Sequence, residues 1–265
     1  MNVRPYTSHE VDLISRRGAC DRLRAITFLI GLCVSLGDEN LFVDLEKSEH
    51  CPYDLDDIFE IEGINFKITK EVNPVDYHLF SSNFSPVTRK GVLSLKPENV
   101  ECHKLFREWH AAYGRLKPHV SIAHEIEGLK VDDSFLGVHV RRTDKVSNSK
   151  FAIAEFTTTP SEILPDLDRE FLKRIFSSLK SRALNKVYLA CDNQASMEIY
   201  RNRILEGGVN VVTNGEAFDD SKLRHTSGKS LVMDIFGLSN CSGILKSINS
   251  GVPDLARRIK KHRTG

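Results

Sequence analysis

FLGVHVRRTDK, residues Phe135–Lys145, is the stretch of sequence from which the fold can be inferred. It begins as an apolar run interrupted by one histidine, which is typical of a strand buried inside a parallel sheet. The arginines, aspartate and lysine at its end cannot follow that strand into a core, because unpaired charges are costly to bury. They are therefore expected where the strand leaves the sheet. In open α/β sheets, ligands bind at this carboxyl edge.

Two adjacent arginines, Arg141 and Arg142, stand at the predicted edge. A guanidinium presents a rigid fork of N–H donors that suits phosphate oxygens, so we predict that they bind a diphosphate. A cluster of ion pairs on the surface is the alternative. His139 lies two residues before Arg141, and the alternation of side chains along a strand places both on one face. This histidine could line a nucleotide site or be a core residue bonded to the backbone.

Composition narrows the class of protein. The chain has 265 residues with 37 basic and 36 acidic side chains, a balance that argues against a general nucleic-acid binder. No apolar run reaches membrane-spanning length, and the first ten residues lack the layout of a signal peptide. We therefore expect a cytoplasmic protein, with peripheral association at a membrane surface left open. The six scattered cysteines lack zinc spacing and are expected to be free thiols.

Predicted strands and helices alternate on both sides of the central strand. Before it, a strand at Val11–Ser15, a helix at Arg22–Leu36 and a strand at Leu41–Leu45 form a βαβ unit, with Asp21 as helix N-cap and Gly37 as its stop. Further predicted elements are a strand at 64–68, an irregular region at 70–99, helices at 100–113, 116–126, 163–184, 194–205, 231–238 and 252–261, and strands at 186–190, 209–212 and 243–246. We predict an α/β protein with two Rossmann-like doubly wound domains, residues 1–125 and 126–265.

Three further positions could bind a nucleotide. Asp234 lies in the apolar run Leu231–Phe236, where a carboxylate needs a donor; guanine offers two N–H groups, and a loop is the alternative partner. Ser250 opens the last predicted helix and could donate to a phosphate or simply cap the helix. Gly18 lies in the turn before the first predicted helix, which is either an anion cradle or an ordinary turn.

Two short acidic patterns point in another direction. Asp54–Asp56 and Asp166–Asp168 each match the D-x-D pattern of metal-dependent glycosyltransferases. Patterns of three residues are common by chance, and neither follows a clear buried strand. We interpret both as helix caps or solvated faces.

Several of these segments, taken together, resemble one known family. HVRRTDKV at His139–Val146 resembles the donor-site motif of the α1,6-fucosyltransferase superfamily, which includes core-type and nodulation-type enzymes. The same resemblance extends over ISRRG with Asp21, VYLACD, SLVMD and the Asn-Ser pair, at Ile14–Gly18, Val187–Asp192, Ser230–Asp234 and Asn249–Ser250. The order and spacing of the segments are more specific than any one of them.

This resemblance implies a GT-B fold, GDP-fucose as donor, inversion at the anomeric carbon and no metal or other cofactor. Carried over position by position, Arg141 holds the β-phosphate, assisted by Arg142. The resemblance also places Gly18, His139, Lys145, Asp192, Asp234 and Ser250 in the donor site, with His139 and Asp234 at the guanosine and Ser250 at the phosphates. Asp144 is the first candidate for the general base that deprotonates the acceptor hydroxyl, and Glu155 is the second.

The resemblance thus implies an inverting, metal-independent fucosyltransferase. Its partners would be GDP-fucose and an oligosaccharide or glycolipid hydroxyl, with an α1,6 linkage. Two alternatives stay open: the same fold with another GDP-sugar, or a protein that binds a sugar nucleotide or glycan without catalysis.

Overall fold

The predicted central strand is present as β7, Phe135–Val140, and all six of its residues are buried. The computed structural model describes residues 2–6, 18–43, 45, 47–68, 77–80, 102–143, 164–219, 226–248 and 250–263. Strand β7 belongs to a four-stranded sheet in the order β10-β7-β8-β9, whose strands all run parallel. The other strands are β8 at Lys186–Cys191, β9 at Asn210–Val212 and β10 at Gly243–Lys246.

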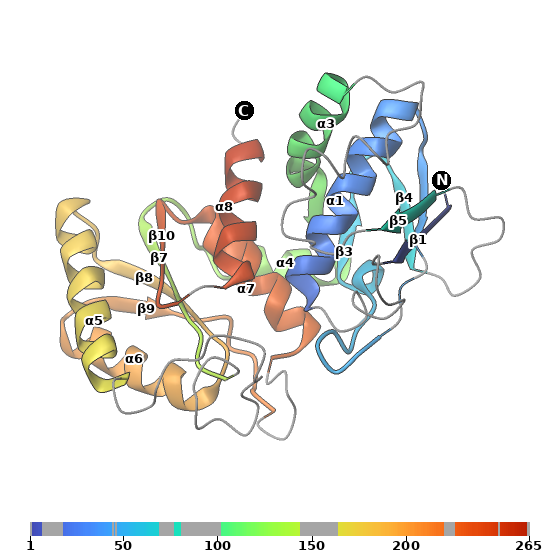
Figure 1. The fold of residues 1–265 in the computed structure, drawn as a ribbon. Helices are drawn as coiled ribbons and strands as arrows, with labels where there is room; N and C mark the ends of the chain where they lie inside the picture. The colour runs from blue at the N-terminus through green and yellow to red at the C-terminus, as the bar shows by residue number, and fades with distance from the viewer. Residues whose placement is uncertain are drawn as a thin grey trace. The chain divides into compact units, whose positions relative to one another are not determined.

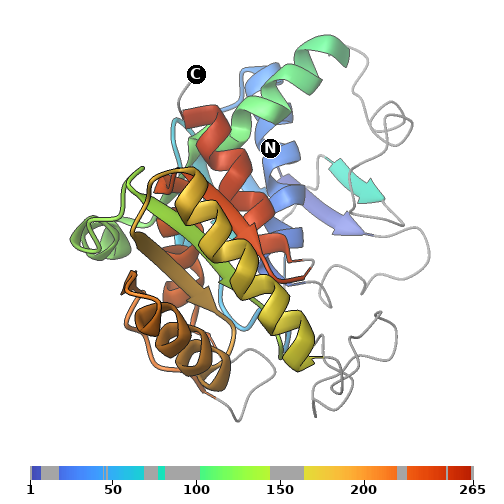
Figure 2. The same cartoon turned by 90° about the vertical axis from the view of Figure 1, so that its left-hand side faces the viewer.

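Helices cover both faces of this sheet. Alternate residues of β7 face opposite sides: Leu136, Val138 and Val140 pack with α5, Leu164–Ser181, and α6, Gln194–Glu206. On the other side, Phe135 packs with side chains of α7, Gly228–Asn240, and α8, Gly251–Arg263. Figure 2 shows α5 and α6 together on one side of these strands. The predicted doubly wound arrangement is therefore confirmed for the C-terminal half.

The N-terminal half contains a second parallel sheet, in the order β4-β2-β1-β5. Its strands are β1 at Asn2–Tyr6, β2 at Asn40–Val43, β4 at Asn65–Ile68 and β5 at Tyr77–Phe80. Helix α1, Ala19–Leu36, packs against α3, Cys102–Arg115. A short helix η1 at Leu55–Asp57 and an antiparallel pair, β3 at Phe59–Ile61 with β6 at Leu116–Pro118, complete it.

Contacts along the chain separate it into two units, each with its own sheet. The first contains Met1–Val120 together with Arg258–Gly265, and the second contains Ser121–Arg257. The sequence analysis placed the boundary between the two domains at 125/126. Helix α8 begins in the second unit, and its last residues belong to the first. Figure 1 labels the elements of both units.

Several local predictions need correction. The predicted helix at 116–126 is instead the short strand β6 followed by α4, Val120–Gly128. Helix α1 begins three residues before the predicted start, so Gly18 is its N-cap and Asp21 lies in its first turn. The predicted stop is confirmed, because Gly37 has a left-handed backbone with φ of 73°. Strand β5 falls in a region predicted to be irregular, and the predicted strand at 11–15 lies outside the described residues.

Candidate functional site

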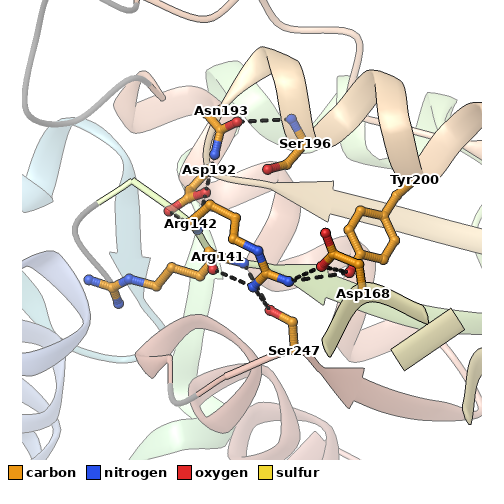
Figure 3. A network of polar contacts seen from close by, with 8 residues as sticks. All are labelled: Arg141, Arg142, Asp168, Asp192, Asn193, Ser196, Tyr200 and Ser247. Carbon is orange, nitrogen blue, oxygen red and sulfur yellow. Dashed lines mark hydrogen bonds and ion pairs between the residues drawn. The ribbon is translucent and has the colours of Figure 1, made fainter. Parts of the chain in front are cut away.

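The candidate site is the carboxyl edge of the C-terminal sheet. Because β7, β8 and β10 run parallel, the residues after each strand meet at one edge. Arg141, Arg142 and Thr143 follow β7, Asp192 follows β8, and Ser247 follows β10. Figure 3 shows Arg141, Arg142, Asp192 and Ser247 gathered in one network of polar contacts.

Asp192 holds the backbone that leaves β7. Its carboxylate accepts hydrogen bonds from the amide of Arg142 at 2.8 Å and the amide of Thr143 at 3.0 Å. The hydroxyl of Thr143 donates to the carbonyl of Asp192 at 3.1 Å, and the side chain of Asn193 donates to the carboxylate at 2.9 Å. Asn193 also caps α6, since its side chain accepts from the amide of Ser196. The predicted donor-site residue Asp192 is thus the anchor of the turn that presents the two arginines.

The side chain of Arg141 takes a direction of its own. Its backbone amide donates to the hydroxyl of Ser247 at 3.2 Å. In Figure 3 its guanidinium extends away from that of Arg142. Taken as a whole residue, Arg141 is half-buried.

The guanidinium of Arg142 is turned into the protein. It forms an ion pair with Asp168 of α5, and its other contacts are the carbonyl of Arg141 at 3.0 Å, the hydroxyl of Ser247 at 3.2 Å and the hydroxyl of Tyr200 at 3.3 Å. The interpretation of Asp168 as part of a solvated face was wrong, because its carboxylate also accepts from Tyr200 at 2.5 Å. The sequence could not show this, since Arg142 and Tyr200 lie 26 and 32 residues from Asp168.

Two buried polar atoms lie near the same edge. Nδ1 of His139 and Oγ of Ser250 form no hydrogen bond within the part of the chain that the structure describes. Their residues are 4% and 6% exposed. Burial lowers the pKa of His139 to about 3, with further contributions from the charges of Arg141 and Lys246, so the ring is neutral at pH 7. Buried polar atoms are usually satisfied, so a partner for each of these two would have to come from outside the described residues.

Asp234 is buried in α7 with two protein donors. The hydroxyl of Tyr188 donates to its Oδ1 at 3.0 Å, and Nδ2 of Asn214 donates to the same oxygen at 2.8 Å. Burial raises the pKa of Asp234 to about 8, although both hydrogen bonds act to lower it. Asn214 also reaches the hydroxyl of Ser230 at 2.9 Å, so it ties the segment after β9 to α7. Sequence reasoning missed Asn214 because it lies in a polar stretch with no motif.

Comparison with known proteins supplies an independent view of this arrangement. The sequence matches no protein-family model and no curated protein. The structure is similar to that of the fucosyltransferase NodZ from Bradyrhizobium, with a TM-score of 0.52 and 16% identity over 97% of this chain and 92% of that one. It is also similar to POFUT1 in complex with GDP-fucose, with a TM-score of 0.54 and 9% identity over 99% of this chain and 94% of that one.

The chain has a GT-B fold. This confirms the predicted fold class. At such low identities the similarity concerns the arrangement of the backbone.

The remaining predicted site residues are distributed differently. Gly18 belongs to the first unit, where its carbonyl accepts from the amides of Asp21 and Arg22 at the start of α1. Asp144, Lys145 and Glu155 lie outside the described residues, so their roles stay predictions.

Two features are absent from the residues that the structure describes. They contain no group of three or more His, Cys, Asp or Glu side chains placed to hold a metal ion. None of the helices in the described ranges is long and apolar enough to cross a lipid bilayer.

Proposed function

We propose that this chain is an inverting fucosyltransferase that transfers fucose from GDP-fucose to a hydroxyl of an oligosaccharide or glycolipid. The observation that carries the proposal is that Arg141 lies at the same sheet edge as two buried polar atoms, on His139 and Ser250, that have no hydrogen-bond partner among the described residues. A nucleoside diphosphate suits such a site, because its phosphates can pair with a cation and its base, sugar and phosphates offer hydrogen-bond partners to buried polar atoms. The GT-B fold adds support, since fucosyltransferases share it.

In this proposal the nucleotide base lies against α7. Guanine would donate its N–H groups to the carboxylate of Asp234. Tyr188 and Asn214 both donate to Oδ1, which fixes the orientation of the carboxylate and makes Oδ2 the oxygen that a ligand would use. The neutral His139 would complete the contacts to the guanosine, and Ser250 would donate its hydroxyl to a phosphate at the start of α8.

Arg141 would supply the main stabilisation of the transition state. As the bond between the anomeric carbon and the β-phosphate oxygen breaks, negative charge grows on the departing GDP. A guanidinium already positioned by the sheet edge would offset that charge, so the proposal requires no divalent ion and no cofactor. On the opposite face of the sugar, the acceptor oxygen would form the new bond while its proton passes to a carboxylate. Asp144 is proposed as this base, with Glu155 as the second candidate.

The test is the release of GDP from GDP-fucose, with and without candidate acceptor glycans. Arg141→Ala should lower the rate by about a hundredfold or more, by analogy with the loss of an oxyanion-hole donor. Arg203→Ala is the matched control, since Arg203 is exposed on α6 and pairs only with Glu206 among the ion pairs of the described residues. Near-normal turnover in Arg141→Ala would contradict the assignment.

The products of the same assay decide the finer points. Analysis of the fucosylated acceptor would test the α1,6 linkage and the inversion. Turnover only with another GDP-sugar would replace fucose in the proposal. Tight GDP binding without turnover on any sugar or acceptor would favour a binding protein.

A further inference from the structure

The contacts of Arg142 give it a role different from that of Arg141. Its side chain is 10% exposed, and its guanidinium is in contact with α5, α6 and the segment after β10. Its backbone amide is held by Asp192 at 2.8 Å. Residue 142 is therefore fixed at both its backbone and its side-chain end. A side chain held in this way sets the path of the backbone on either side of it.

Asp168 and Tyr200 form the far end of this arrangement. Oδ1 of Asp168 accepts from both the guanidinium of Arg142 and the hydroxyl of Tyr200, and Tyr200 is 1% exposed. Burial, followed by the hydrogen bond to Asp168, raises the pKa of Tyr200, so its hydroxyl keeps its proton and donates. A largely buried ion pair costs desolvation energy, and it contributes to specificity only when its geometry is well determined. Here the geometry of the ion pair is determined by two helices, α5 with Asp168 and α6 with Tyr200.

Ser247 links the two arginines. Its hydroxyl accepts from the backbone amide of Arg141 and from the guanidinium of Arg142, both at 3.2 Å. The same guanidinium donates to the carbonyl of Arg141 at 3.0 Å. A shift of the Arg142 side chain would therefore move the backbone from which the Arg141 side chain begins.

We infer that Asp168 and Tyr200 are positioning residues that hold Arg142, and through it the backbone of Arg141, in place for binding a diphosphate. The inference rests on the proposed function and deepens it. Arg142 then acts through the protein, and Arg141 is the arginine that touches the phosphates. Figure 3 shows the two guanidinium groups pointing in these different directions.

Calorimetric titration with GDP and with guanosine tests this inference. Guanosine lacks the diphosphate, so a positioning role predicts a loss of affinity for GDP alone. Asp168→Asn should weaken GDP binding by about tenfold, since misplacement of a binding group by about 1 Å costs up to a hundredfold. Tyr200→Phe removes one neutral hydrogen bond and should weaken GDP binding by roughly threefold. Both should leave the affinity for guanosine within about twofold of wild type.

Asp166→Asn is the matched control on the same helix. Asp166 lies two residues before Asp168, on the opposite face of α5, with a side chain that is 76% exposed and a partner in Arg169 at 3.1 Å. It should bind both ligands like wild type. Circular dichroism and thermal melting verify that each variant is folded, and Tyr200→Phe decides the question if Asp168→Asn does not fold.

The outcomes separate the inference from the function on which it rests. Unchanged or tighter GDP binding in the folded Asp168→Asn and Tyr200→Phe variants overturns the inference alone, and tighter binding would show that a released Arg142 reaches the phosphates. Equal losses for GDP and guanosine also overturn it, since they indicate general disruption. A wild-type chain that binds GDP no better than guanosine overturns the diphosphate site itself, and the inference with it.

Discussion

Asp234 makes the proposed recognition of guanine dependent on pH. Tyr188 and Asn214 occupy Oδ1, and the remaining oxygen, Oδ2, can accept from the N–H groups of guanine only when it carries no proton. Burial raises the pKa of this carboxyl group to about 8, so the free protein holds it mainly in the protonated form at neutral pH. Binding of guanosine should therefore release a proton from Asp234.

The size of the effect follows from that pKa. A carboxyl group with a pKa of about 8 is roughly nine-tenths protonated at pH 7, so binding should release about 0.9 proton there. The binding-competent fraction rises about tenfold from pH 6 to pH 7, and the apparent affinity for guanosine should rise by the same factor. Above about pH 8 the affinity should level off. Guanosine is the suitable ligand because it carries no phosphate that titrates in this range.

Isothermal titration calorimetry at pH 7 in two buffers with different ionisation enthalpies measures the proton release. Asp234→Asn keeps an oxygen that can accept from Tyr188 and Asn214, so it should fold, but it should show neither the proton release nor the pH dependence. Asp166→Asn should behave like wild type, since its carboxylate is exposed on α5. Guanosine binding with no proton release in wild type, and with the same affinity at pH 6 and pH 7, would refute the reasoning.

Stability supplies a second measurement on the same residue. Because the pKa of Asp234 is raised on folding, the contribution of this residue to folding stability is complete below its ordinary pKa of 3.8. That contribution is lost as the pH rises towards about 8. The free energy of unfolding of wild type should fall relative to Asp234→Asn by about 1.4 kcal/mol per pH unit across this window, and by about 6 kcal/mol at most. Parallel urea-unfolding profiles of the two proteins from pH 5 to pH 8 would contradict this.

Three further predictions concern single positions. Because the pKa of His139 is lowered on folding, its contribution to folding stability is complete above pH 6.5 and is lost as the pH falls towards about 3. His139→Gln should therefore reduce the acid-induced loss of stability by about 1.4 kcal/mol per pH unit in that window. Unchanged acid unfolding would contradict this. A Cβ at Gly31 would lie 2.6 Å from backbone atoms of Trp109, so Gly31→Ala should cost about 1–3 kcal/mol in urea unfolding, whereas Gly128→Ala, which meets open space, should change stability by less than about 0.5 kcal/mol. Asn193→Ala removes the cap of α6 and a donor to Asp192, and thermal melting should show a loss of about 1 kcal/mol; an unaltered melting temperature would count against the cap.

The sequence predicted correctly those elements that are buried and consist mainly of apolar residues. Strand β7 and the strands beside it are apolar runs, so their presence could be read from local composition. The helix predicted at 116–126 failed because β6 is a strand only through its pairing with β3, more than fifty residues earlier in the chain. No local pattern carries that information, and Pro118 is tolerated both in a first helical turn and at the end of a short edge strand.

The polar contacts of the site show the same division. The arginines, His139 and Asp234 could be singled out because charged or polar groups in apolar surroundings need partners. The identity of those partners depends on the fold. Asp168 was interpreted as part of a helix cap or solvated face, yet it forms an ion pair with Arg142. Asn214 matches no sequence motif, and only the fold brings it into contact with Asp234 of α7. Sequence reasoning therefore found the groups that need a partner more readily than the groups that provide one.

The most direct test of the account is a calorimetric comparison of GDP, UDP and ADP binding to the wild-type protein at pH 8. A site built around the carboxylate of Asp234 should bind GDP at least about tenfold more tightly than the other two, because only guanine offers two adjacent N–H donors along one edge. Equal affinity for the three nucleotides, or no binding of GDP, would contradict the account.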